Sequence, residues 1–140
     1  MFELADFYNY CKRNRVDVIP YPGAPKPGAT IRDGNWYAVF LDFSQIKSLQ
    51  FLRGVCCHEL GHAATGALHK VCSPYELWER SEYRAKRYVA QHFLTVEDFQ
   101  EAFDAGYTEP WQLAEFFELP EEDVKSALSY WTERKEVVFH

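Results

Sequence analysis

The chain has 140 residues, which fits one domain. A domain of this length buries enough surface for a stable core without disulfide bonds or structural metal ions. Hydrophobic residues make up 47% and aromatic residues 17%, which disfavours disorder over most of the length. The net charge of −6 disfavours a nucleic-acid surface, because phosphate binding depends on Lys and Arg. The sequence has no apolar run long enough for a transmembrane helix, and its N-terminus lacks the basic start and apolar stretch of a signal peptide. We therefore expect a cytoplasmic protein with no membrane partner.

Cysteine usage agrees with a reducing compartment. No C-x-x-C pair is present among Cys11, Cys56, Cys57 and Cys72. Cys56 and Cys57 are adjacent on an expected helix, where their side chains diverge. Free thiols that serve as small apolar packing residues are the expectation.

The first third of the chain predicts a helix and a small sheet. Residues 2–14 have the apolar spacing of an amphipathic helix. Strand formers fill 16–19 and 35–42, and residues 30–32 are expected to pair with the second of these as a hairpin. Residues 20–28 hold four of the seven prolines and two glycines, which predicts an irregular loop between short strands. The sheet should be antiparallel in part.

The rest of the chain predicts helices. From residue 44 the apolar period becomes helical, with a stripe that includes Leu49, Leu52 and Cys56, and Asp42 or Ser44 as the N-cap. The later expected elements are a long helix from Ser73-Pro74 to about 94, a helix over 96–105 capped by Thr95 and ended by Gly106, helices near 110–117 and 121–132, and an extended stretch over 136–139 that adds an edge strand or frays.

The sequence His58-Glu59-Leu60-Gly61-His62 is an H-E-x-x-H motif inside the first long helix. Residues i and i+4 lie one turn apart on one helix face, so both imidazoles can bind one ion, and imidazole nitrogen suits Zn²⁺. Glu59 is rotated about 100° from His58, which suits it to hold a metal-bound water and take its proton as a general base. The competing interpretation is a solvated helix with two incidental histidines.

A catalytic zinc site usually has a third protein ligand. The second long helix offers carboxylates at Glu76, Glu79 and Glu82. We favour Glu82, because the small Ala85 on the same face allows the two helices to approach closely, and we keep Glu79 in reserve. Gly61 is costly inside a helix, by roughly 0.5–1 kcal/mol, which also indicates a close approach.

An extended three-histidine motif does not fit. The pattern H-E-x-x-H-x-x-G-x-x-H would need glycine at 65 and histidine at 68, where this chain has Thr65 and Leu68. Gly66 and His69 are each one residue off, and a one-residue slip turns a helical side chain by about 100°. His92 and His140 are interpreted as ordinary surface or core residues.

The chain resembles the ImmA/IrrE metallopeptidases of bacteria, phages and mobile elements. The resemblance rests on residues 58–62, on Glu82-x-x-Ala85 and on residues 106–119, where the family carries a helix-turn-helix-like segment. It covers roughly residues 35–132. Many members have a Met-Pro pair after the glutamate helix, whereas this chain reads Phe93-Leu94-Thr95-Val96.

The resemblance implies an α+β fold with a zincin-like core, a small sheet, an active-site helix and a C-terminal helical segment. We expect one metallopeptidase domain over 1–140, with the core in 1–94 and a helical subregion in 95–132. It implies that His58, His62 and Glu82 bind Zn²⁺ and that Glu59 is the catalytic base. It also implies an endopeptidase that cleaves a partner transcriptional repressor.

The proposed reaction still needs a donor for the developing oxyanion, and Tyr107, His69 and Tyr75 are the candidates. Between Thr95 and Tyr130 the chain has ten acidic residues and one basic residue, so this helical segment would repel DNA phosphates and suits a basic protein partner or is a solvated face. Two other functions stay open: a non-catalytic zinc-binding adaptor and a helix-turn-helix-like regulator.

Overall fold

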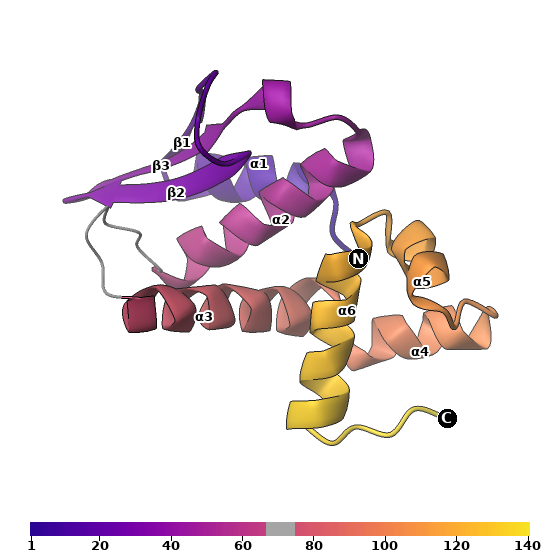
Figure 1. Cartoon of the computed structure of the whole chain (residues 1–140). Coiled ribbons are helices and arrows are strands. Elements are labelled where there is room, and N and C mark those ends of the chain that lie inside the picture. The colour runs from indigo at the N-terminus through magenta and orange to yellow at the C-terminus, as the bar shows by residue number, and fades with distance from the viewer. Residues whose placement is uncertain (67–74) are drawn as a thin grey trace.

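A three-stranded sheet and the helices that cover it form the first half of the molecule, and four further helices form the second half (Figure 1). The computed structural model describes residues 1–66 and 75–140, and the side chains of α3 from Glu79 onward. The elements are α1 (Leu4–Arg13), β1 (Val16–Pro20), β2 (Gly28–Asp33), β3 (Trp36–Leu41), the 3₁₀ turn η1 (Phe43–Gln45), α2 (Leu49–Thr65), α3 (Tyr75–Phe93), α4 (Val96–Asp104), α5 (Pro110–Phe117), α6 (Glu121–Ser129) and the π-helical turn η2 (Tyr130–Arg134). The α+β class expected from the sequence is confirmed.

The sheet is mixed, with strand order β1-β3-β2. β2 and β3 form an antiparallel hairpin whose last pair is Asp33 with Trp36. Gly34 takes a φ of +60° in the turn between them, a conformation that glycine adopts without strain. β1 runs parallel to β3, with Val16 opposite Tyr37. The predicted hairpin and partly antiparallel sheet are therefore confirmed, and β2 is left at an edge.

Asp42 fixes the proline-rich loop before β2. One carboxylate oxygen of this buried residue accepts hydrogen bonds from the backbone N–H groups of Gly23 and Ala24, at 3.1 Å each, and from the Gln45 side chain at 2.8 Å. The hydrogen bonds from Ser44 and Gln45 lower the pKa of Asp42 to about 2. The loop that carries Pro25 to Pro27 is thus held in place at the start of β2.

Helix α2 is the central element, with α1 and β2 packed on it on one side and α3 on another (Figure 1). It begins later than predicted, because the Ser48 side chain accepts a hydrogen bond from Phe51 N at 3.0 Å, whereas Asp42 caps only the turn η1. It ends at Gly66, which has the left-handed φ of +65°. The predicted apolar stripe is wrong at Leu49, which is 65% exposed. A helix enclosed on several faces does not show one apolar stripe.

The later helices follow the sequence prediction closely. Thr95 and Asp98 form a reciprocal capping box at the start of α4, and Gly106 follows the end of α4 with a φ of +92°. Within the described residues, the stretch 136–139 forms no strand. Its Phe139 instead packs edge-on against Phe103, with the ring centroids 5.0 Å apart. The predicted start of α3 at residues 73–74 lies outside the described residues.

Arg53 joins α2 to both the N-terminus and the turn between α5 and α6. Its guanidinium is buried and donates hydrogen bonds to the Glu118 carbonyl at 2.8 Å, to the Phe2 carbonyl at 2.5 Å and to the Glu3 carboxylate at 3.2 Å. The fork of donors on one guanidinium suits three acceptors on separate segments. Arg53 therefore sets where the helical subregion sits on α2.

The cysteines that the structure describes are free and buried at Cys11, Cys56 and Cys57, as predicted. Burial raises the pKa of Cys56 to about 12, so this group stays a neutral thiol at physiological pH. Cys72 lies outside the described residues. Among the described helices, none combines the length and the apolar character needed to cross a bilayer.

Candidate metal centre

Three side chains from two helices converge at the centre of the molecule. His58 and His62 come from α2 and Glu82 comes from α3. The two Nε2 atoms lie 3.1 Å apart, and the Glu82 carboxylate places one oxygen 2.9 Å from His58 Nε2 and the other 3.0 Å from His62 Nε2. The predicted grouping of His58, His62 and Glu82 is therefore present as a compact set of donor atoms.

Small residues allow the two helices to come this close. A Cβ atom on Gly61 would lie 2.7 Å from the backbone oxygen of Ala85, a distance at which one helix must move. Ala85 itself is fully buried at the contact. Glu82 lies one turn before Ala85, so the close approach brings its carboxylate level with the histidines. Gly61 and Ala85 thus have the role that the sequence indicates for them.

The spacing of the donor atoms matches a small divalent ion. A tetrahedral zinc ion with bonds of about 2.0–2.1 Å sets its donor atoms roughly 3.3 Å apart. The two Nε2 atoms, 3.1 Å apart, are close to this value, and one donor atom from each of the three side chains lies within 4.8 Å of the other two. Two imidazole nitrogens and one carboxylate form a donor set whose chemistry suits a divalent ion such as zinc. These residues therefore fit a divalent metal ion.

His58 and the Glu82 carboxylate stabilise each other's charged forms. Burial favours the neutral form of His58, but the hydrogen bond to Glu82 and the negative charges of Glu59, Glu82 and Asp123 outweigh burial, and the pKa of His58 is raised. Burial acts against the Glu82 carboxylate as well, yet its hydrogen bonds to both histidines lower its pKa well below the ordinary value. Glu82 is therefore an anion over the whole physiological range, as a metal ligand must be.

The second ring nitrogens of the two histidines have different surroundings. Nδ1 of the buried His62 lies 3.4 Å from the Ser81 hydroxyl. Nδ1 of His58 makes no direct hydrogen bond to any residue that the structure describes. The two rings therefore differ in how their orientation is fixed.

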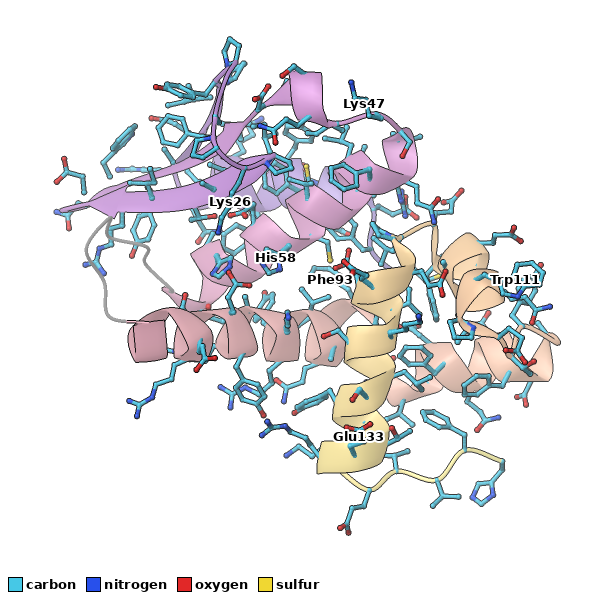
Figure 2. All side chains as sticks on the ribbon, in the orientation of Figure 1. Lys26, Lys47, His58, Phe93, Trp111 and Glu133 are labelled. Atoms are coloured by element: carbon cyan, nitrogen blue, oxygen red, sulfur yellow. The ribbon has the colours of Figure 1, made fainter. Side chains whose placement is uncertain are left out.

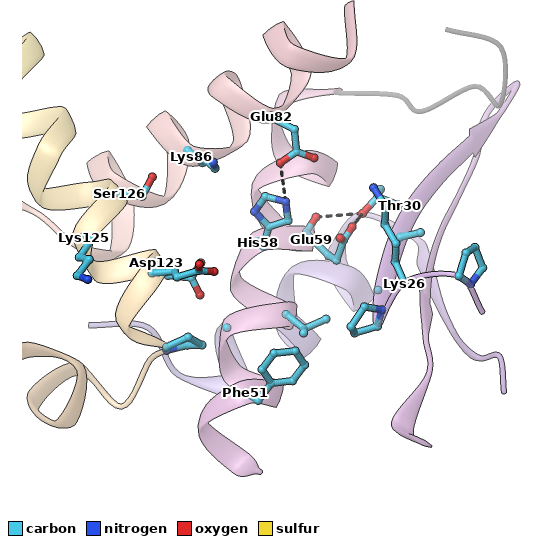
Figure 3. A pocket seen from close by; sticks show the side chains of 18 of the residues that line it. Lys26, Thr30, Phe51, His58, Glu59, Glu82, Lys86, Asp123, Lys125 and Ser126 are labelled. Atoms are coloured by element: carbon cyan, nitrogen blue, oxygen red, sulfur yellow. Dashed lines mark hydrogen bonds and ion pairs between the residues drawn. The ribbon is translucent and has the colours of Figure 1, made fainter. Parts of the chain in front are cut away.

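Glu59 lies beside the centre and is held by the sheet. Its carboxylate accepts a hydrogen bond of 2.5 Å from the Thr30 hydroxyl of β2, and its side chain is 5% exposed (Figure 3). Gly28 gives it room, because a Cβ atom there would lie 3.2 Å from Glu59 Cγ and 2.6 Å from a Val55 methyl carbon. Glu59 does not join the three converging donor atoms, in agreement with its predicted separate role.

An open cleft of about 1370 Å³ runs past these residues. Its walls are the loop and strand over residues 25–31 on one side and the start of α6 on the other, with α2 between them (Figure 3). His58, Glu59 and Glu82 all line it, whereas His62 does not. Figure 2 shows His58 at the middle of the molecule, below Lys26 of the cleft wall. His58, Glu59 and Glu82 are therefore open to solvent through this cleft.

Asp123 is a cleft residue that sequence reasoning missed. It extends from α6 toward His58, on the side of the ring away from Glu59 (Figure 3). Burial raises its pKa to about 6, although the nearby charges of His58 and Lys86 act in the opposite direction. Its carboxylate makes no hydrogen bond or ion pair to any described residue. Thr30 and Ser81 were missed as well, because single hydroxyl residues give no signal in the sequence.

The other candidates lie away from the centre or outside the described part of the chain. Glu79 is exposed and is not among the converging ligands. Tyr107 packs against Phe116, with ring centroids 5.1 Å apart, and does not line the cleft. His92 stacks on Tyr88 and His140 is exposed, as expected of ordinary residues. The side chains of His69, Tyr75 and Glu76 lie outside the described residues.

No protein-family model, no curated protein and no solved structure matches the chain. A functional proposal therefore depends on the geometry and chemistry of the site itself.

Proposed function

We propose that this protein is a zinc-dependent endopeptidase with a zincin-like core. The observation that carries the proposal is the convergence of His58, His62 and Glu82 on one point at the wall of an open cleft, with the carboxylate of Glu59 held beside them. A catalytic zinc site needs three protein ligands and one open position, and three converging donor groups at the wall of a cleft support this proposal. A structural zinc site would instead be closed by a fourth protein ligand.

In the proposed reaction, His58, His62 and Glu82 would hold the metal ion, which when bound would polarise the scissile carbonyl and lower the pKa of a water molecule. Glu59 accepts the proton of that water and delivers it to the leaving amine. Thr30 keeps the Glu59 carboxylate pointing at the cleft through its 2.5 Å hydrogen bond. Glu82 balances the positive charge of the centre, because its carboxylate stays ionised.

The cleft suits an extended peptide. β2 forms one wall, and of the described strands only β3 pairs with it. The free edge of a sheet can hydrogen-bond an added strand along its backbone, which gives affinity without dependence on sequence. A peptide bound in this way would pass Glu59 on the way to the metal ligands.

We further propose that the chain acts as an ImmA/IrrE-like peptidase on a partner transcriptional repressor in the cytoplasm. The order of the motifs in the sequence supports this, as does the acidic character of the helices after residue 95. Ten acidic residues and one basic residue between Thr95 and Tyr130 suit a basic protein partner and repel nucleic acid.

The decisive experiment is the substitution Glu59→Gln. Zinc content of the purified protein and cleavage of an unstructured protein such as casein are measured for the wild type and the variant. The variant should keep its zinc and lose cleavage by about 10²–10⁴-fold. Wild-type protein that binds no zinc, or a variant that cleaves at the wild-type rate, overturns the proposal.

The metal ligands are tested by a matched pair of variants on α3. Glu82→Ala should abolish zinc binding, whereas Glu79→Ala should leave it unchanged, because Glu79 is exposed. Loss of zinc only in Glu79→Ala would reverse the ligand choice. A non-catalytic zinc-binding adaptor is the second candidate, and a Glu59→Gln protein with an unchanged biological effect supports it.

A further inference from the structure

The two histidines of the metal centre differ in what surrounds their second ring nitrogen. A histidine that binds metal through one nitrogen normally donates the other N–H to a carboxylate, a carbonyl or a water molecule, which fixes the ring. Ser81 lies at that position for His62, at 3.4 Å from Nδ1. His58 directs Nε2 at Glu82 and His62, so its Nδ1 points away from them.

A small cavity of about 20 Å³ lies beside His58, between α2, α3 and α6. Its polar lining residues are His58, Lys86, Asp123 and Ser126. About 10–15 Å³ of such space suffices for one water molecule if two to four polar groups face it. The cavity therefore has the size and the polarity to hold one ordered water molecule.

The packing of α6 on α2 holds Asp123 at this cavity. A Cβ atom on Gly54 would lie 2.5 Å from two ring carbons of Pro120 and 2.8 Å from Oδ2 of Asp123. Gly54 and His58 are four residues apart on α2, so they lie on the same face one turn from each other. The absence of a side chain at Gly54 thus places the Asp123 carboxylate on the helix face that presents His58.

Asp123 is also poorly accounted for by folding alone. A partly buried carboxylate that has no hydrogen bond to any described residue lowers the stability of the fold, because its desolvation is not compensated. A hydrogen-bond donor nearby would offset this cost. His58 and Lys86 line the same small cavity as Asp123. A water molecule between Asp123 and Nδ1 of His58 would satisfy both groups.

We propose that Asp123 is a positioning residue of the metal centre, which orients His58 through one water molecule held in the cavity between α2 and α6. This inference rests on the proposed function, since it needs His58 to bind a metal ion. It assigns a role to the helical subregion over 95–132, which then completes the metal site of the core. The Asp123 carboxylate accepts from the water, and the water accepts from Nδ1–H of His58.

The test compares two substitutions of similar volume at one position. Asp123→Asn keeps an acceptor oxygen, whereas Asp123→Leu fills the same space with no acceptor. Zinc affinity of the full chain is measured by competition with a chromophoric chelator, and the visible spectrum of the Co²⁺-loaded protein reports ligand geometry. Glu122→Leu is the control, because Glu122 is an exposed neighbour on the same helix.

Asp123→Leu should bind zinc about 10–100-fold more weakly than the wild type and change the Co²⁺ spectrum, while Asp123→Asn stays much closer to the wild type. Glu122→Leu should match the wild type in both measurements. Equal affinities in all the variants, or equal losses in Asp123→Asn and Asp123→Leu, overturn the role of Asp123 and leave the proposed function standing. A wild-type protein that binds no zinc overturns both.

Discussion

The α-carbon of Gly61 faces the backbone carbonyl of Ala85 so closely that a methyl group on Gly61 would lie 2.7 Å from that oxygen. The neighbour is helix backbone, which cannot turn aside as the end of a flexible side chain can. The separation of α2 and α3 is therefore fixed by the lack of a side chain at Gly61. Because Glu82 is on α3 and both histidines are on α2, this contact also sets the size of the candidate metal centre.

The substitution Gly61→Ala should therefore loosen the site and destabilise the fold. A Gly→Ala change inside an ordinary helix stabilises by roughly 0.5–1 kcal/mol, whereas overpacking costs about 1–3 kcal/mol. We expect a lower free energy of unfolding in urea and a weaker affinity for zinc, because α3 must move away with Glu82. A variant that is more stable than the wild type and binds zinc equally well would contradict this account of the helix contact.

The hydrogen bond between Thr30 and Glu59 gives a second prediction, which concerns rate rather than metal binding. Thr30→Val keeps the shape of the buried side chain and removes the hydroxyl that donates to Glu59. Hydrogen bonds to charged groups are worth about 1.5–3 kcal/mol, so kcat should fall about 10–100-fold. Zinc content should not change, because Thr30 touches none of the three metal ligands.

Thr30→Ser is the matched control, since it retains the hydroxyl and loses only a methyl group. Its kcat should stay within a few fold of the wild type. If the Ser and Val variants lost activity equally, the contribution of Thr30 would be packing of β2 against α2, and the hydrogen bond would have no role in catalysis.

Arg53 provides a prediction on stability. Arg53→Ala leaves the carbonyl groups of Phe2 and Glu118 without their buried donor. Unpaired buried polar groups cost about 1–3 kcal/mol each, so the free energy of unfolding should fall by about 2–4 kcal/mol in urea denaturation. Arg53→Lys keeps the charge but cannot reach all of the acceptors at once, and its loss should be smaller. Equal stability of Arg53→Ala and the wild type would show that the three segments do not depend on this side chain.

Much of the candidate metal centre's geometry could be predicted from the sequence because it depends on local structure. The spacing of His58 and His62 places them on one face of any helix, whatever the helix packs on. Gly61 and Ala85 mark a close helix contact, since small residues in helices serve that purpose, and Glu82 follows from the position of Ala85. The hairpin of β2 and β3 depends in the same way on a local turn at Gly34.

The remaining features depend on contacts between segments that are distant in the sequence. Asp123 reaches the cleft only because Pro120 and the start of α6 pack on Gly54. Leu49 belongs to an apolar stripe in the sequence, but as the first residue of α2 it is 65% exposed. Tyr107 was a candidate donor by residue type, yet it packs in the helical subregion. No local pattern carries such information.

The charges of His58 and Glu82 lead to a pH prediction for protein treated with a chelator. The pKa of Glu82 is lowered below its ordinary 4.5, so its stabilising contribution is present above pH 4.5 and is lost as the pH falls below that value. The pKa of His58 is raised above 6.5, so its contribution is complete below pH 6.5 and is lost as the pH rises through the higher value. The pair should stabilise chelator-treated protein most between about pH 4.5 and 6.5. Stabilisation by bound zinc should instead increase as the pH rises above 6.5, because zinc binds neutral histidines. The rise in Tm that zinc causes should therefore be larger at pH 8 than at pH 6. Glu82→Gln removes the carboxylate charge and should flatten the pH dependence of stability in chelator-treated protein. An unchanged pH profile in that variant would show that the His58–Glu82 pair does not act on stability.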